Sequence, residues 1–293
     1  DAQESRGLGD VYKRQDIHGE DRDFRWRWGN LIGSAGWNYL INRKLFATFT
    51  GGYTRYRSHI IQKQNAFVSS PDKNGQVYFQ EGHYRSAMED VNLRASFDYR
   101  PNVDHRIRMG SDYLFHLFRP EQSNMSSWYK DSVVSQMNNT VFSHSLIHGH
   151  EVSLYAEDEM LLTDRLRVNA GLRFTLFHVQ GETYQSFQPR FSARYLLGRN
   201  LSAKVSYTKM NQYIHLLSNS YISQPTDIWV PVTGNIRPMH AHQVTGGLFW
   251  HYKELDFSAE GYYKRMNNLV EYKDNGPVLP SFEGWEDLSL IHI

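Results

Sequence analysis

The sequence contains no cysteine, no long hydrophobic run and no excess of charge of either sign. Without cysteine the chain has neither disulfides nor thiolate metal sites. Because no stretch of about 18 apolar residues occurs, a helical membrane span is excluded. The 32 Lys and Arg residues are balanced by 31 Asp and Glu, and no long run of one sign exists, so no nucleic-acid partner is expected.

Enzyme motifs are also missing. The sequence has no HExxH, no GxSxG, no P-loop and no GxGxxG after a strand, so we expect neither an enzyme nor a bound cofactor. The carboxylates Glu157, Asp158 and Glu159 in YAEDEM could serve acid/base catalysis. Alternation places Asp158 opposite the two glutamates near a strand end, and we favour a role in salt bridges there.

The two ends of the chain differ from the rest. Residues 1–15, ending in GLGDVYKRQ, and residues 287–293, DLSLIHI, resemble translated sequencing-adapter sequence. We interpret both as tails that are not native and take residues 16–286 as the native part. The N-terminus has no apolar core typical of a signal peptide, so we expect the natural start to be missing.

Aromatic residues are abundant and alternate with polar ones. The aromatic fraction is 14%, with 19 Tyr and 7 Trp, while the mean hydropathy is −0.61. Residues 90–99, DVNLRASFDY, place apolar side chains on one face of a strand and polar ones on the other, and residues 166–176 repeat the pattern. A polar average is compatible with a membrane β-barrel, in which lipid-facing and lumen-facing residues alternate.

About ten segments follow this habit. They cover residues 26–39, 45–60, 90–99, 105–118, 150–161, 166–176, 186–196, 201–208, 242–252 and 255–272. Several exceed ten residues, which suits a bilayer, since a spanning strand needs about 9 to 11 residues. Short links near Asn42, Pro101, Thr163, Gly198 and Lys253 alternate with long polar links at about 61–83, 119–149 and 211–241, and a shorter one lies around Gly181.

This order of short and long links predicts an orientation, because outer-membrane barrels have tight periplasmic turns and long external loops. Aromatic residues near the short turns predict a girdle at the inner interface; they are Trp37, Tyr39, Tyr99, Tyr195, Trp250 and Tyr252. The polar positions carry charges that a dry core cannot hold, so they must face water or a lumen. The charged residues are Arg94, Asp98, Arg106, Arg108, Arg167, Arg173, Arg190, Arg194, Lys204, Glu260 and Lys264.

We therefore predict an all-β fold, a transmembrane antiparallel up-and-down β-barrel represented by about ten strands. Ten strands of this kind leave unpaired edges, which lipid cannot satisfy, so the barrel is expected to continue. A charged interior indicates a wide barrel, and wide outer-membrane transporters are plugged.

Several phrases resemble TonB-dependent outer-membrane receptors of the Bacteroidetes type. They are WRWGNLIGSAGWNYLINRKLFATFTGGYTRYR, LRASFDYRPNVDHRIRMGSDYLFHLFRP, SLYAEDEMLLTDRLRVNAGLR, QPRFSARYLLGRNLSAKVSYTKMNQYIHLLS and PTDIWVPVTGNIRPMHAHQV. The resemblance implies a 22-stranded barrel in the outer membrane, an N-terminal plug domain that contacts the TonB complex, and energised import. It also implies outer-membrane lipid, a surface lipoprotein and a small-molecule or oligosaccharide cargo as partners. The plug and the TonB box are not recognisable in this sequence.

Candidate ligand-binding residues lie after the strands that run outward. They are His116, Arg119, Trp128, Tyr129, Tyr213, His215 and Trp229. The proline-rich phrase that contains Trp229 can grip a ligand, but we favour a structural segment packed over the barrel mouth. His144, His148 and His150, and likewise His240 and His242, are weak metal candidates, and we favour surface histidines without a metal.

The leading hypothesis is a receptor-transporter for a scarce solute such as a siderophore, a metal complex, a corrinoid or a glycan fragment. An alternative is an outer-membrane barrel without energised transport, adhesin-like or devoted to assembly, which explains the alternation but not the family phrases. A soluble β-rich carbohydrate-binding or enzymatic domain would need a dry core shared between sheets.

Overall fold

The computed structural model describes residues 17–70, 73–130, 135–143, 146–217, 228–272 and 289–292. Within these ranges every regular element is a strand, and none is a helix that could cross a membrane. The strands are β1 (Ile17–Asn42), β2 (Leu45–Ser70), β3 (Lys73–Tyr99), β4 (His105–Lys130), β5 (Ser135–Ser143), β6 (Ile147–Thr163), β7 (Leu166–Val179), β8 (Glu182–Leu196), β9 (Leu201–Gln212), β10 (Ile214–Leu217), β11 (Ile228–Pro231), β12 (Met239–Tyr252), β13 (Leu255–Asn267), β14 (Leu269–Tyr272) and β15 (Ser289–His292).

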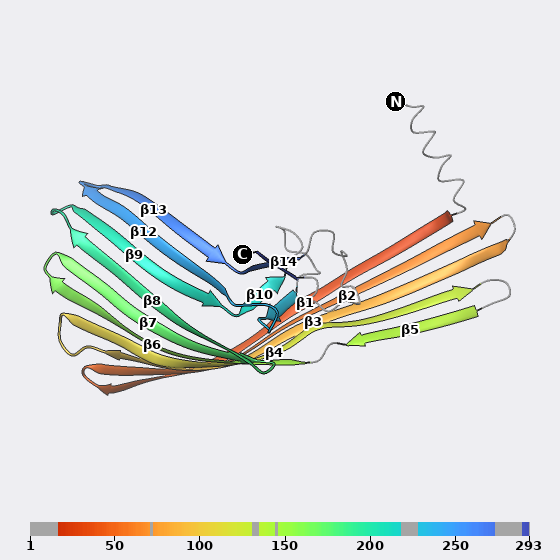
Figure 1. The fold of residues 1–293 in the computed structure, drawn as a ribbon, viewed down its shortest axis with the longest axis horizontal. Helices are drawn as coiled ribbons and strands as arrows, with labels where there is room; N and C mark the ends of the chain where they lie inside the picture. Colours follow the sequence, from red (N-terminus) through yellow and green to blue (C-terminus); the bar gives the residue numbers. More distant parts are fainter. Residues whose placement is uncertain are drawn as a thin grey trace, which may run out of the picture. The chain divides into compact units, whose positions relative to one another are not determined.

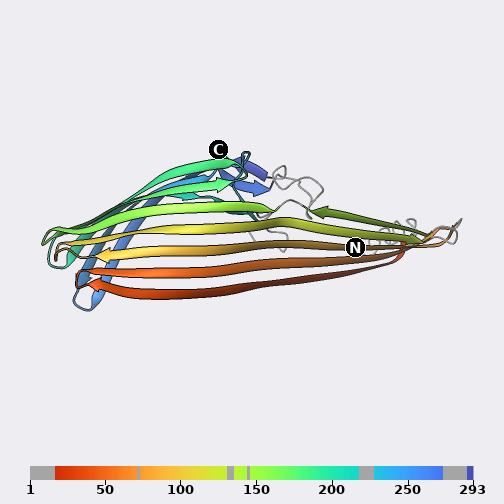
Figure 2. The same cartoon turned by 90° about the horizontal axis from the view of Figure 1, so that it is seen from below.

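The main sheet joins its strands in the order β1-β2-β3-β4-β6-β7-β8-β9-β12-β13, with β5 paired to β4. Successive strands of this path lie side by side in both views (Figures 1 and 2). The pairs from β4 to β13 are antiparallel throughout. The ten strands and the up-and-down order expected from the sequence are confirmed, and β10-β11 and β14-β15 form two small separate sheets.

The chain divides into two compact units. One contains residues 1–30, 56–87 and 119–145, and the other contains residues 31–55, 88–118 and 146–293. Strands β1 to β4 each contribute residues to both units.

Side-chain oxygens form the tight turns expected at Asn42, Asn102 and Thr163. Asn42 Oδ1 accepts a hydrogen bond from the backbone N of Lys44 at 2.8 Å, and Thr163 Oγ1 accepts one from the N of Leu166 at 3.0 Å. Such local bonds favour a turn over a continued ladder. Between β7 and β8, Gln180 and Gly181 both have positive φ, 48° and 87°, which gives the two-residue hairpin turn that twisted strands prefer.

Two of the three long links expected from the sequence are wrong. Residues 61–70 and 73–83 belong to β2 and β3, and residues 119–130 and 135–143 belong to β4 and β5. Strands β1 to β4 have 26 or 27 residues each, more than twice the number that spans a bilayer. Alternation did not reveal these extensions because, beyond lipid, neither face of a strand needs to be apolar.

In the larger unit, the two faces of the sheet differ in chemistry. One face exposes a band of large apolar side chains; examples are Leu93, Leu154, Leu172, Phe187, Val205, Leu248 and Phe257. The other carries the charged and polar residues, together with one compact apolar cluster described below. The first face corresponds to the lipid-facing positions expected from the sequence, and we call the second the lumen face.

Candidate functional site

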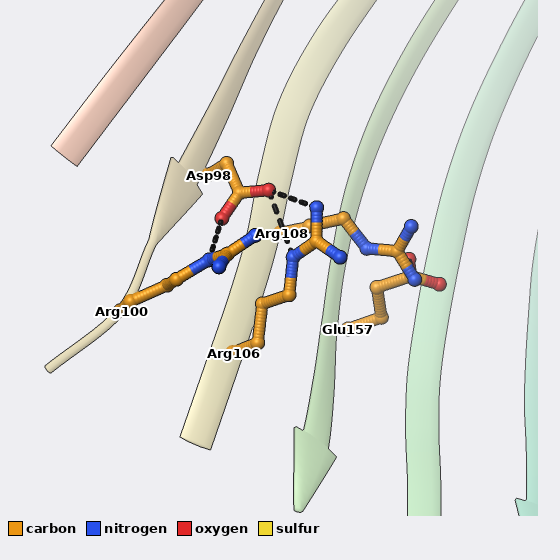
Figure 3. Close-up of polar contacts among 5 residues, drawn as sticks. All are labelled: Asp98, Arg100, Arg106, Arg108 and Glu157. Atoms are coloured by element: carbon orange, nitrogen blue, oxygen red, sulfur yellow. Dashed lines mark hydrogen bonds and ion pairs between the residues drawn. The ribbon is translucent and has the colours of Figure 1, made fainter. Parts of the chain in front are cut away.

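A ladder of ion pairs crosses the lumen face near the short turns (Figure 3). Asp98 on β3 accepts hydrogen bonds from Arg106 Nε at 2.9 Å and from Arg100 Nε at 3.3 Å. Arg108 on β4 lies 2.7 Å from Glu157 on β6. Arg106 donates to Asp98 Oδ2 from both Nε and Nη2, so the two residues form a charge-assisted pair between β3 and β4.

The ladder continues to β7, where Arg167 lies 3.1 Å from Glu159. Asp158 points to the opposite face and contacts His105 Nδ1 at 2.7 Å. The salt bridges expected at YAEDEM are therefore confirmed. The acidic and basic groups of this ladder thus pair across neighbouring strands from β3 to β7.

Asp112 is the deepest charge of the lumen face, with a side chain only 3% exposed. Its Oδ1 accepts a hydrogen bond from Arg94 Nε at 2.5 Å, and Arg173 Nη1 lies 2.9 Å from Oδ2. One carboxylate on β4 thus joins β3 to β7 across β6. The same residues border a shallow groove with Tyr155 and Arg190.

A chain of neutral hydrogen bonds follows on the loop side of Asp112. Ser153 and Thr175 share a bond at 2.9 Å, Gln188 Nε2 donates to Thr175 at 3.2 Å and to Ser186 at 3.0 Å, and Tyr213 donates to Ser186 at 2.6 Å. Ser153, Thr175, Ser186 and Gln188 could not be singled out from the sequence, because short polar side chains on alternating positions look the same whether they are buried or in contact with water.

The segment after β9 folds back onto the lumen face. The Tyr213 ring stacks on Phe177 at 5.0 Å, and burial raises the pKa of Tyr213. Tyr184 on β8 donates to the carbonyl oxygen of Thr233 at 2.6 Å, and Thr233 Oγ1 accepts from the backbone N of Asn235 at 3.3 Å. These contacts fix the turn of the phrase WVPVTGNI against the sheet.

An apolar cluster lies beneath this segment. It consists of Phe118, Ile147, Phe177, Val179, Tyr213, Val230, Val232 and Ile236. Strands of the sheet supply four of these residues and the folded-back segment supplies the others. The position of the segment agrees with the structural role that we favoured for the proline-rich phrase; residues 218–227, its first part, lie outside the described residues.

Besides Tyr213, two further candidate ligand-binding residues lie within the folded-back segment. His215 on β10 pairs in register with Val230 on β11 and is 4% exposed. Burial lowers the pKa of His215 to about 4, so the imidazole is neutral at pH 7. Trp229 on β11 is 37% exposed.

The remaining candidates lie on β4. His116 is buried on the lumen face and donates from Nδ1 to Asp90 Oδ1 at 2.7 Å. Arg119 follows three positions later, so it projects from the opposite face of the strand. Trp128 and Tyr129 pair with Met137 and Gln136 on β5 rather than lying in a loop, and their side chains lie outside the described part.

The histidine candidates do not form a metal centre among the described residues, where no group of three His, Asp or Glu side chains is suitably arranged. His148 and His150 lie on β6, exposed on the side away from the lumen, and contact the rings of Phe115 and Tyr113. His144 falls outside the described residues. His240 and His242 lie edge to face at 5.9 Å at the start of β12.

An exposed row of aromatic rings on β1 was not among the sequence candidates. Phe24, Trp26 and Trp28 occupy alternate positions and are 53%, 39% and 60% exposed. The two indoles lie 6.1 Å apart, and Trp26 Nε1 donates to Ser58 Oγ at 3.1 Å. The signal was present in the phrase FRWRW, but its alternation was used only to predict a strand.

The strand order and the polar lumen face indicate a membrane barrel, and the comparison with known families identifies the family to which this barrel belongs. The model of the family described as TonB dependent receptor-like, beta-barrel, matches residues 2–283. The chain belongs to this family. No curated protein matches it in sequence.

Solved structures of TonB-dependent receptors share the fold. The RagAB peptide transporter is similar over 97% of this chain and 34% of its own, with a TM-score of 0.54 and 10% identity. The ferric enterobactin receptor PfeA in complex with BCV-L6 is similar over 89% of this chain and 46% of its own, with a TM-score of 0.50 and 10% identity. The chain therefore spans less than half of each solved chain.

Members of the TonB-dependent receptor family are outer-membrane proteins, so the exposed apolar face contacts membrane lipid. At its end near the short turns stand the aromatic residues of the expected girdle. Trp37 and Tyr39 on β1 contact one another at 5.6 Å, as do Trp250 and Tyr252 at 5.4 Å. Amphipathic rings at this level suit the boundary between lipid and water.

Proposed function

We propose that this chain forms part of the barrel wall of a receptor that imports a scarce solute across the outer membrane with energy from the TonB complex. The folded-back segment, described at residues 213–217 and 228–236, carries the proposal most directly. A barrel whose lumen face binds its own outer segment through buried contacts has a narrowed mouth, as a selective uptake system needs. Family membership supports the coupling to TonB through a plug domain.

The cargo is expected to meet aromatic side chains on the outer part of the barrel. Phe24, Trp28 and Trp229 are exposed and can stack on planar chelates, sugar rings or aromatic peptides. We assign a positioning role to the buried residues His116, Tyr213 and His215, which hold the folded-back segment on the lumen face. The cargo classes to test are siderophores, metal complexes, corrinoids and glycan fragments, with peptides added because RagAB is a peptide transporter.

Uptake by the full receptor tests the proposal. The receptor is expressed in a Gram-negative host with and without TonB, and the depletion of a defined mixture of ferric chelates, corrinoids, oligosaccharides and peptides is followed by mass spectrometry. We expect at least one class to be depleted only with TonB present. Equal depletion of every class in both hosts would contradict energised import.

A matched pair of variants tests the aromatic contact. Replacement of Phe24 and Trp28 by Ala removes two stacking platforms and should raise the half-saturating cargo concentration roughly tenfold. Trp37→Ala is the control, since Trp37 is 62% exposed, close to the 60% of Trp28, but lies in the girdle. An equal effect of both changes would show that the row does not bind cargo.

A further inference from the structure

In the smaller unit, the parts of β1, β2 and β3 that belong to it have two chemically different faces. Trp26 on β1 donates a hydrogen bond to Ser58 on β2, so the even-numbered positions of these two strands share a face. The rings of His59 on β2 and His83 on β3 stack at 5.4 Å, so the odd-numbered positions share the other face. Because side chains alternate along a strand, the residues of each face follow from these two contacts.

The odd-numbered face carries the charges. Arg25 lies 2.8 Å from Asp23, and Lys63 lies 3.1 Å from Glu81. Further charged residues at odd-numbered positions are Asp21, Arg27, Arg57 and Arg85. A charged solute would therefore find its ionic partners on this side of the three strands.

The even-numbered face is almost free of charge. In residues 21–30, 56–65 and 79–87, the parts of these strands in the smaller unit whose side chains the structure describes, Arg22 alone is charged at an even-numbered position. The other positions carry aromatic, amide and hydroxyl side chains, with one isoleucine and one glycine. They are Phe24, Trp26, Trp28, Asn30, Tyr56, Ser58, Ile60, Gln62, Gln64, Gln80, Gly82, Tyr84 and Ser86.

Three exposed aromatic rings follow one another on this neutral face. Phe24, Trp26 and Trp28 lie at alternate positions of β1, and the planes of the two indoles make an angle of 34°, so their faces are nearly aligned. The hydrogen bond from Trp26 to Ser58 fixes the orientation of the first indole. Because four residues of a strand extend about 13 Å, the row is an ordered aromatic platform of about that length.

We propose that the neutral face binds an uncharged oligosaccharide whose sugar rings stack on Phe24, Trp26 and Trp28. The C–H groups on one side of a sugar ring are weakly positive and pack on the negative face of an aromatic ring. Sugar hydroxyls both donate and accept hydrogen bonds, and the amide and hydroxyl side chains of this face, such as Gln62, can do the same. An anionic chelate would find its cationic partners on the opposite face instead. The assignment rests on the proposed function, because it names the class of cargo that the receptor captures.

Oligosaccharide binding by the full receptor in detergent tests the assignment. The receptor is applied to an array of neutral oligosaccharides that includes maltoheptaose, cellohexaose, xylohexaose and mannohexaose, and the affinity of each bound sugar is measured by isothermal titration calorimetry. We expect at least one neutral oligosaccharide to bind at least about tenfold more tightly than hexagalacturonate. The acidic oligosaccharide brings a carboxylate on every ring to a face that has almost no cation, and an unpaired charge is costly to desolvate.

Variants of two neighbouring residues separate the two faces. Trp28→Ala removes the most exposed indole of the row and should weaken binding of the neutral oligosaccharide about tenfold. Trp28→Phe keeps an aromatic face and should retain most of the affinity. The control is Arg27→Gln, which changes an exposed residue on the opposite face of the same strand and should leave the affinity unchanged.

Three results would each overturn the oligosaccharide site. They are no binding of any neutral oligosaccharide of the array, equal losses in Trp28→Ala and Arg27→Gln, and tighter Trp28-dependent binding of a peptide or a ferric chelate. Binding is measured without TonB, so a bound sugar that cells with TonB fail to deplete contradicts the proposed import and leaves the site intact. Depletion of another class of cargo, with no sugar bound, contradicts the site alone.

Discussion

Asp112 accepts a hydrogen bond from Arg94 at 2.5 Å although its own side chain is 3% exposed and the arginine side chain is 51% exposed. A buried carboxylate is therefore stabilised by a partner that keeps contact with water. With Arg173 on the other oxygen, Asp112 links strands that do not neighbour one another. The relationship explains why a charge can lie deep on the lumen face.

Asp112→Ala should destabilise the barrel wall. The change leaves Arg94 and Arg173 without their common partner, and because both retain some exposure we expect a loss of about 1 to 3 kcal/mol in the free energy of unfolding. Urea unfolding of the full receptor in detergent measures it. The control is Asp256→Ala, whose carboxylate is 85% exposed and contacts His251 near a turn. An equal loss in the control would mean that burial of Asp112 adds nothing.

Gly110→Ala should also destabilise the sheet. A Cβ at this position would collide with the carbonyl oxygen of Ala95 and would stand 2.8 Å from the hydroxyl oxygen of Tyr155. Because the first neighbour is backbone, the strands must shift, at a cost of about 1 to 3 kcal/mol. Gly246→Ala is the matched change, since nothing lies within 4 Å of its Cβ. Thermal unfolding that ranks the two variants in the opposite order would contradict the geometry.

Ile236→Ala should loosen the folded-back segment without unfolding the sheet. Ile236 is 1% exposed in the apolar cluster, and deleting such a side chain costs about 2 to 4 kcal/mol. Hydrogen exchange of the full receptor should show faster exchange in β10 and β11, with no change in β6 and β7. Leu216→Ala in β10 is the comparison because Leu216 is 38% exposed. If the two variants exchange alike, the cluster does not hold the segment.

The folded-back segment should open as the pH falls. The folded-state pKa of His215 is about 4, below the ordinary value of 6.5, because burial disfavours the charged ring. Below pH 6.5 the open state binds a proton that the closed state refuses, so stability is lost between pH 6.5 and 4 and is fully present above pH 6.5. At pH 5 the opening equilibrium should rise about 30-fold over its value at pH 8.

Exchange protection of β10 and β11, corrected for the intrinsic pH effect, measures this opening. His215→Asn removes the titrating group and should abolish most of the change. A pH response that persists unaltered in this variant would assign it to another group. His240→Asn is the control, since His240 lies at the start of β12 and outside β10 and β11. This variant should leave the pH response of β10 and β11 unchanged.

The alternation of residues was sufficient to predict the ten strands, their order and the two faces. Period-two patterning is local, and lipid on one side forces it on every spanning strand. The short turns were predictable as well, because Asn42 and Thr163 bond to their own backbone neighbours. The existence of a charged face could be predicted from the sequence, but the ion-pair partner of each charged residue could not.

Only the tertiary structure decided which polar groups are buried and which segments meet. Asp112, Ser153 and Gln188 look in sequence like any lumen residue. In the structure Asp112 is buried between Arg94 and Arg173, and Ser153 and Gln188 belong to the chain of hydrogen bonds that ends at Tyr213. Strand pairing beyond the bilayer escaped prediction because water on both faces removes the constraint that produces alternation.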